Sequence, residues 1–243
     1  MKKLIALILS VCVILSMTAC GSVDEKQEKY DKAMSDYDAG NYQSARASFE
    51  KLGDYKDSKG MIQSCDYAQA SQWMDDEKYE KAAALFAELG EYEDSQEKGK
   101  ACNYAVAKNL MDDEEYTKAA QLFETLGDYE DSAEKMQKCR ANEIDALLQG
   151  SWEATESVMT FNYRFDKGRF VAKLSAGGSS ISNEGSYRVD VENQEIYVCY
   201  DYIIGASGTK TPNTDEQMLF TYTYDGETFT LANSTNQTVE KQS

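Results

Sequence analysis

A repeat of 37 residues is the feature that most constrains the fold of this 243-residue chain. Aromatic, small and turn-forming residues recur in register three times. A fixed period of this length predicts a solenoid, in which stacked units share a continuous core. The clearest recurring positions are Tyr30, Tyr67 and Tyr104; Phe49, Phe86 and Phe123; Gly53, Gly90 and Gly127; and Cys65, Cys102 and Cys139.

Each unit is predicted to contain a shorter and a longer helix. In the segment 79–89, apolar residues at positions 82, 85, 86 and 89 lie on one helical face. Gly90 follows, and we expect it to end the helix as a left-handed cap. Asp94 and Asp131 each have a glutamate three residues later, which predicts a capping box at the start of the longer helix.

The shorter helix, with the pattern Tyr-x-x-Ala-x-x-x-Phe-x-x-Leu, resembles the second helix of the tetratricopeptide repeat. The longer helix departs from that family, because Asp66 and Gln69 stand where large apolar residues are usual. Residues 27–149 are therefore predicted to form a tetratricopeptide-like α-solenoid. The resemblance implies a protein-binding groove lined by three tyrosines, and packing of the same rings between helices is the alternative. These tyrosines are Tyr30, Tyr67 and Tyr104.

The recurring cysteines are predicted to be buried, free thiols. Equivalent positions in stacked helix pairs lie about 10 Å apart, whereas a disulfide needs Cα atoms within about 7 Å. The chain has no histidine to complete a zinc site. We predict neither a metal site nor a cofactor.

From residue 150 the composition changes to a pattern typical of strands. Met159, Phe161, Tyr163 and Phe165 alternate with smaller or polar residues. About seven such strands follow one another, which predicts an antiparallel meander closed into a small barrel or strongly curled. The fold class is therefore α+β with two domains, an α-solenoid followed by an antiparallel β-barrel.

Residues 150–232 resemble the compact lipocalin-like domains of bacterial lipoproteins. The resemblance depends on Gly-Ser-Trp-Glu at 150–153, Phe-Asp-Lys-Gly-Arg-Phe at 165–170, Gly-Ser-Tyr at 185–187 and the segment 224–231. It implies a barrel in which Trp152 plugs one end or lines a ligand. A barrel of this size holds either side chains or one small ligand. Residues 233–243 are expected to be a frayed polar tail.

The N-terminal segment has the pattern of an export signal sequence. Lys2 and Lys3 precede an apolar run that is too short for a comfortable membrane span. The segment 16–21, Ser-Met-Thr-Ala-Cys-Gly, resembles the lipobox of bacterial lipoproteins. That resemblance implies removal of residues 1–19, acyl chains such as palmitate on Cys20, and a tether over 20–26. The predicted location is the extracytoplasmic face of the cell membrane.

Charge and composition exclude several classes of function. With 43 acidic and 25 basic side chains the net charge is −18, which opposes binding to nucleic acid. The absence of histidine excludes Ser-His-Asp and Cys-His catalysis. We predict no catalytic residues and a protein that is not an enzyme. The expected function is a protein-interaction scaffold at the cell envelope, with a protein partner there. The alternative is a binding protein that holds a small apolar molecule in the barrel.

Overall fold

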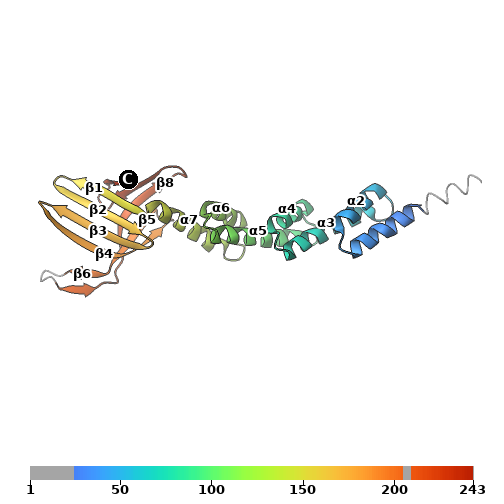
Figure 1. The fold of residues 1–243 in the computed structure, drawn as a ribbon, viewed down its shortest axis with the longest axis horizontal. Helices are drawn as coiled ribbons and strands as arrows, with labels where there is room; N and C mark the ends of the chain where they lie inside the picture. Colours follow the sequence, from blue (N-terminus) through green and yellow to red (C-terminus); the bar gives the residue numbers. More distant parts are fainter. Residues whose placement is uncertain (1–24, 205–208, 243) are drawn as a thin grey trace, which may run out of the picture. The chain divides into compact units, whose positions relative to one another are not determined.

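The computed structural model describes residues 25–204 and 209–242, and it divides into two compact units, Met1–Val106 and Ala107–Ser243. Helices precede a sheet domain in the chain (Figure 1). Residues 25–38 are helical. The helices that follow are α2 (Tyr42–Leu52), α3 (Ser58–Asp75), α4 (Tyr79–Leu89), α5 (Ser95–Asp112), α6 (Tyr116–Leu126) and α7 (Ser132–Leu148). The strands are β1 (Gly150–Glu156), β2 (Met159–Asp166), β3 (Arg169–Ala176), β4 (Ser179–Asp190), β5 (Glu195–Tyr200), β6 (Tyr202–Ile204), β7 (Lys210–Pro212), β8 (Gln217–Tyr224), β9 (Phe229–Asn233) and β10 (Thr238–Lys241).

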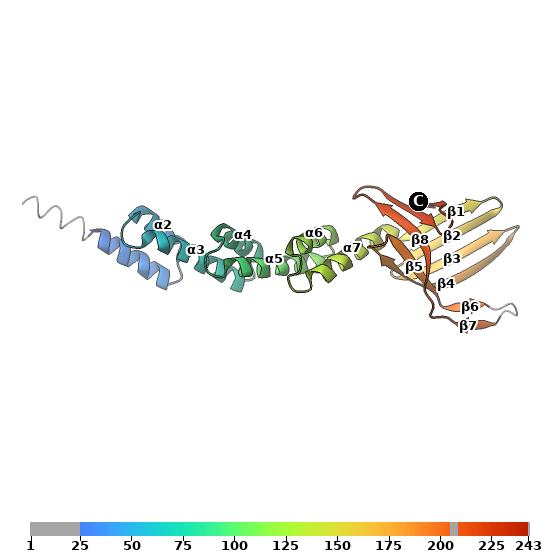
Figure 2. The ribbon, with the colours of Figure 1, turned by 180° about the vertical axis from the view of Figure 1, so that it is seen from behind.

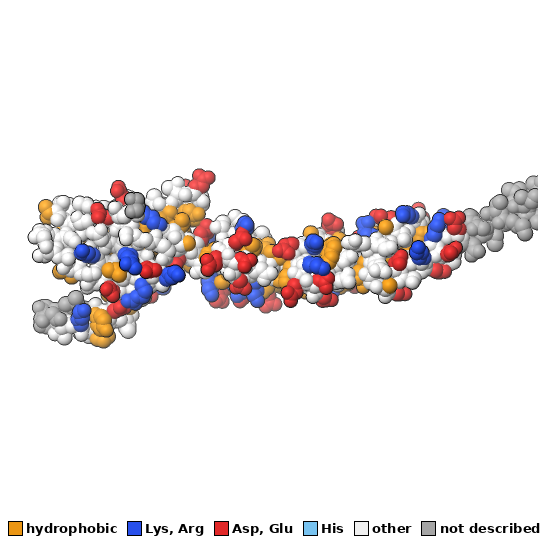
Figure 3. Space-filling model, in the orientation of Figure 1, with side chains coloured by type: hydrophobic (Ala, Val, Ile, Leu, Met, Phe, Trp, Pro, Cys, Tyr) orange, Lys and Arg blue, Asp and Glu red, His pale blue; other side chains and the backbone are white. Residues whose placement is uncertain are grey.

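The helices alternate in length, as the 37-residue repeat predicts. α2, α4 and α6 each have 11 residues, while α3 and α5 have 18 and α7 has 17. α2 and α4 both pack against α3, and α6 packs against α7. The helical part of the predicted fold class is confirmed. Red and blue side chains are interspersed over the outside of these helices (Figure 3).

The helical units bury small clusters of residues that lie near one another in sequence. Phe49 packs with Ala33, Ala45, Leu52 and Cys65. One period later, a second cluster contains Ala70, Ala82, Ala83, Phe86 and Cys102. Cys65, Cys102 and Cys139 are buried free thiols, and burial raises the pKa of each. Because small residues surround each phenylalanine, the helices of a pair can approach closely.

Two local predictions for the helix ends were wrong. Gly90 has φ of 60° and ψ of −115°, so its φ is positive, but its ψ is not that of a left-handed helical cap. These angles match the first central residue of a type II′ turn, which glycine adopts readily. At Asp131 the predicted capping box does not form either, since its side chain makes no cap hydrogen bond to α7.

Two of the helix-start aspartates bond to tyrosines from the preceding longer helix, two helices earlier in the chain. The Tyr30 hydroxyl donates to Asp57 at 2.5 Å, and the Tyr67 hydroxyl donates to Asp94 at 2.5 Å. The first bond, with burial, raises the pKa of Tyr30 to about 12. The second lowers the pKa of Asp94 below its usual range. The aspartate therefore joins two successive helix pairs, which a local cap could not do.

Eight antiparallel strands close into a barrel, in the order β1-β10-β9-β8-β5-β4-β3-β2. β10 lies in the segment expected to be a frayed tail, and that expectation was wrong. Trp152 and Glu153 of β1 pair with Lys241 and Glu240 of β10, so the last strand closes the barrel on the first. Val239 supplies the buried side chain that holds β10 on the core.

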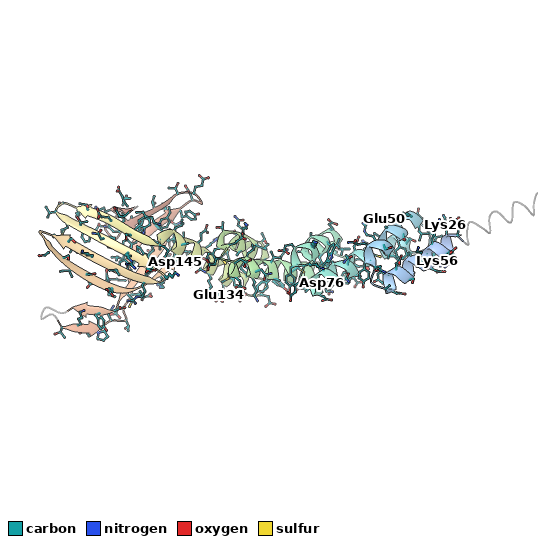
Figure 4. All side chains as sticks on the ribbon, in the orientation of Figure 1. Lys26, Glu50, Lys56, Asp76, Glu134 and Asp145 are labelled. Atoms are coloured by element: carbon teal, nitrogen blue, oxygen red, sulfur yellow. The ribbon has the colours of Figure 1, made fainter. Side chains whose placement is uncertain are left out.

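The end of α7 packs against one end of the barrel. Ile144 and Leu148 belong to the buried barrel core, and the indole N–H of Trp152 donates to the Leu148 carbonyl at 2.7 Å. Asp145, labelled in Figure 4, accepts a hydrogen bond from the Tyr187 hydroxyl. These contacts place the end of α7 in the same compact unit as the barrel.

A two-stranded hairpin, β6 and β7, forms a separate small sheet beside β4 (Figure 2). The carboxylate of Asp201, at the start of this hairpin, accepts hydrogen bonds from both terminal nitrogens of Arg169 on β3. The hairpin is therefore fixed to the outside of the barrel at its base.

Candidate ligand site at the open end of the barrel

The inward-facing side chains of the barrel lie in rows across neighbouring strands. Along β2 and β3, Phe165 pairs with Phe170, Tyr163 with Ala172 and Phe161 with Leu174. The rows continue into β4, where these three β3 residues pair with Gly185, Asn183 and Ile181. Because strand side chains alternate between the two faces, each row forms one layer of the interior.

Aromatic side chains fill the layer next to α7. The rings of Phe165, Phe170 and Phe220 lie within 6 Å of one another in edge or tilted contact, and all three are buried. Gly185 completes this layer without a side chain. A Cβ there would lie 2.2 Å from the Cys199 carbonyl oxygen on β5, so the two strands approach too closely for any other residue.

The opposite end of the barrel, farther along β2 and β3, contains a cavity. Its volume is about 360 Å³, at the lower end of the range for small-molecule sites. In Figure 1 strands β1–β4 extend away from α7 toward this end. The walls are mostly apolar and aromatic. The lining residues are Phe161, Tyr163, Ala172, Lys173, Leu174, Ile181, Asn183, Tyr200 and Leu219.

Ala172 is the reason that space remains in the second layer. Its partners across the sheet are Tyr163 on β2 and Asn183 on β4, so a methyl group stands between two larger polar side chains. In the neighbouring layer, β3 contributes the fully buried ring of Phe170 in place of a methyl group. The cavity therefore follows from one small residue in an otherwise bulky row.

Three polar side chains face this apolar space. The hydroxyls of Tyr163 and Tyr200 and the carboxamide of Asn183 have no hydrogen-bond partner within residues 25–204 and 209–242. Tyr163 is only 7% exposed, yet its hydroxyl oxygen is not among the buried atoms sealed from solvent. These polar groups are therefore reached by solvent at the cavity, where they can bond to water or to a ligand.

Burial keeps both phenols protonated. It raises the pKa of Tyr163 to about 12, with a smaller contribution from the neighbouring Tyr200, and it raises the pKa of Tyr200 as well. Each hydroxyl is therefore a hydrogen-bond donor throughout the neutral pH range. The only charged residue that lines the cavity, Lys173, is exposed.

The structure places Trp152 away from this cavity. Its ring is buried where α7 meets the barrel, in edge contact with Phe229 and with the Lys241 ammonium 5.4 Å from the ring centre. It borders a separate surface hollow with Leu147 and Val239. Trp152 therefore lies at the end of the barrel next to α7, and it does not line the cavity.

The predicted groove tyrosines pack against their own helix pairs. Tyr30 makes edge contacts with Phe49 and Tyr55, and Tyr67 makes the same contacts one period later with Phe86 and Tyr92. Their hydroxyls are bonded to aspartates, so neither tyrosine presents a free hydroxyl.

The remaining predicted residues bring no further site together. Tyr104 is half-buried. Cys20 and the signal segment lie outside the described residues. Among the residues that the structure describes, no helix is both long and apolar enough to cross a membrane. Within the same ranges, no three Cys, Asp or Glu side chains gather in a way that would hold a metal ion.

The fold and site together define a class of protein, an eight-stranded antiparallel barrel with an apolar end cavity, preceded by repeated helix pairs. Comparisons with protein families, with curated proteins and with solved structures gave no match.

Proposed function

We propose that the protein is a membrane-anchored, extracytoplasmic lipoprotein whose barrel binds a small molecule with an apolar body. The observation that carries the proposal is the mostly apolar cavity beside Ala172, whose lining includes the polar residues Tyr163, Tyr200 and Asn183. An apolar pocket with a few convergent polar groups is the usual form of a small-molecule site.

The anchor and the helical repeats complete this proposal. Acyl chains on Cys20 would hold the N-terminus at the membrane, since each buried methylene contributes about 0.8 kcal/mol. The tetratricopeptide-like units then stand between the anchor and the barrel in the chain. In this proposal the helical units connect the membrane anchor to the barrel and have no catalytic role.

Native mass spectrometry tests the ligand-binding function. Residues 21–243, exported by the protein's own host, should retain a recurrent small apolar mass after purification. Ala172→Phe should remove this mass, because the added ring occupies the cavity between Tyr163 and Asn183. Ser175→Phe is the matched control, because it adds a ring of the same size to the same strand on the opposite face of the sheet, outside the lining. Equal ligand content in all three proteins would contradict the proposal.

A second candidate function is the protein-interaction scaffold at the cell envelope. The observation in its favour is that large apolar side chains are exposed on the barrel domain. Val158 is 83% exposed and Tyr202 is 50% exposed, and neither lines the cavity. Cross-linking of residues 21–243 in the host envelope tests this candidate. Loss of a specific cross-linked partner in the double variant Val158→Ser, Tyr202→Ser would support it, and an unchanged pattern would count against it.

A further inference from the structure

The chemistry of the cavity restricts the class of molecule that it would take. We infer that the ligand is a neutral, flat ring compound with a hydroxyl or carbonyl oxygen that accepts hydrogen bonds from Tyr163 and Tyr200. This inference rests on the proposed ligand-binding function and adds the class of ligand to it.

The shape of the walls favours a flat ring. Phe161 and Tyr163 are nearly parallel, with an interplanar angle of 12°, and Tyr163 and Phe170 are nearly parallel at 16°. The centroids of these successive rings are 6.3 and 6.1 Å apart. Phe161 and Tyr163 line the cavity, so it has a wall of aligned aromatic rings. Aromatic groups prefer offset or edge contacts with other rings, which a flat ligand can make along such a wall.

The hydroxyl groups favour an oxygen on that ring. A phenol that stays protonated donates one hydrogen bond, and the donors of Tyr163 and Tyr200 have no acceptor in the described part of the chain. The Asn183 carboxamide offers both a donor and an acceptor at the same cavity. A hydroxyl or carbonyl on the ligand would complete these bonds, whereas a pure hydrocarbon would leave them unmade.

The charge of the lining favours a neutral molecule. No charged side chain in the lining is buried, and the single cation, Lys173, is exposed. A carboxylate or ammonium group inside the cavity would lose its hydration without gaining a buried partner. Tyr222 is buried to a similar degree as Tyr163 but does not line the cavity, so the same inference does not apply to it.

Three matched probes test the inference on residues 21–243: naphthalene, 2-naphthol and 2-naphthoate. Titration calorimetry should show 2-naphthol binding about ten times more tightly than naphthalene, the factor expected from one or two neutral hydrogen bonds. Tyr163→Phe and Tyr200→Phe should each remove most of that advantage and leave the naphthalene affinity unchanged. Tyr222→Phe is the control, because it deletes a buried hydroxyl of the same barrel outside the cavity and should change neither affinity.

The other outcomes separate this inference from the proposed function. Equal affinity for naphthalene and 2-naphthol would overturn the hydroxyl-dependent class and leave an apolar-ligand protein. Tightest binding of 2-naphthoate, lost in Lys173→Gln, would overturn the neutral class. Affinities that do not change in Ala172→Phe would place the probes outside the cavity and would overturn both proposals. Thermal unfolding of each variant checks that the barrel is intact.

Discussion

The helical units and the barrel bury their apolar side chains in different ways. Each helical cluster contains residues that are close in the sequence. For example, Phe49 packs with Ala33 and Cys65. The barrel cluster extends from Ile144 to Val239, so residues almost a hundred positions apart meet in it. In a chain of repeats a defect affects mainly its own unit and the next, whereas in a closed barrel every strand depends on both neighbours. The comparison predicts local failure in the helices and collective failure in the barrel.

The chain carries one tryptophan in each region, which makes the comparison measurable. Trp73 lies in α3, and Trp152 lies in β1. Labelling with 5-fluorotryptophan gives each region its own fluorine NMR signal in the intact protein. Urea titrations can then follow both regions in one sample.

Phe86→Ala should have the largest effect. Phe86 is fully buried at the centre of its helical cluster, and removal of a buried aromatic ring costs about 3–5 kcal/mol. We expect the Trp73 signal to unfold at much lower urea while the Trp152 signal keeps its midpoint. Equal shifts of both signals would show that the two regions unfold as one and would break the comparison.

Gly185→Ala should destabilise the barrel by about 3 kcal/mol, because its Cβ would overlap the backbone of β5. The same substitution in a helix should have the opposite sign. At Gly60 in α3 nothing lies within 4 Å of a new Cβ, so Gly60→Ala should stabilise by about 0.5–1 kcal/mol. Urea midpoints of the two tryptophan signals measure both effects. A tolerated Gly185→Ala would contradict the close approach of β4 to β5.

Alkaline pH should weaken the barrel. Burial raises the pKa of Tyr163 and of Tyr222 to about 12, above the unfolded value of about 10. The stabilisation of the barrel by these two protonated phenols is therefore fully present below pH 10 and is lost as the pH rises toward 12. The Trp152 midpoint should fall over this window. Tyr163→Phe should make the fall shallower, and an identical pH profile in that variant would exclude Tyr163 as a cause.

Glu77→Gly should raise the free energy of unfolding by about 1 kcal/mol. Glu77 has φ of 59°, a left-handed conformation that costs energy for a residue with a Cβ. One period earlier the same position is Gly40, with φ of 77°. Glu88→Gly, at an exposed position inside α4, is the control and should lower stability by about 1 kcal/mol. The Trp73 midpoint measures both, and a loss in Glu77→Gly would contradict backbone strain at that position.

Sequence patterns predicted those parts of the fold that depend on periodicity. The bounds of α4, Tyr79–Leu89, coincide with the predicted helix, because its apolar spacing and its terminal glycine lie within one short segment. β10 was missed because a strand of four residues with one buried side chain, Val239, has too little alternation to detect. The aspartate bonds were missed because the donor tyrosine lies 27 residues away, beyond any local capping pattern.

The site was only partly predictable for a similar reason. Alternation along β2 identified Phe161 and Tyr163 as inward-facing. The space between Tyr163 and Asn183 depends on the register that sets Ala172 between them, and no pattern within one strand contains that register. The sequence feature that could have indicated the cavity is a small residue, Ala172, among large inward-facing side chains. That feature can be interpreted only once the pairing of the strands is known.

The bond from each tyrosine to an aspartate 27 residues later bears on how this chain can change length during evolution. The spacing is shorter than the 37-residue period, so a duplication or deletion of one whole period keeps every such pair in frame. An insertion of any other length between Tyr67 and Asp94 would separate donor from acceptor. Within each Tyr–Asp span the chain therefore tolerates no change of length, whereas the number of whole units can vary without breaking these bonds.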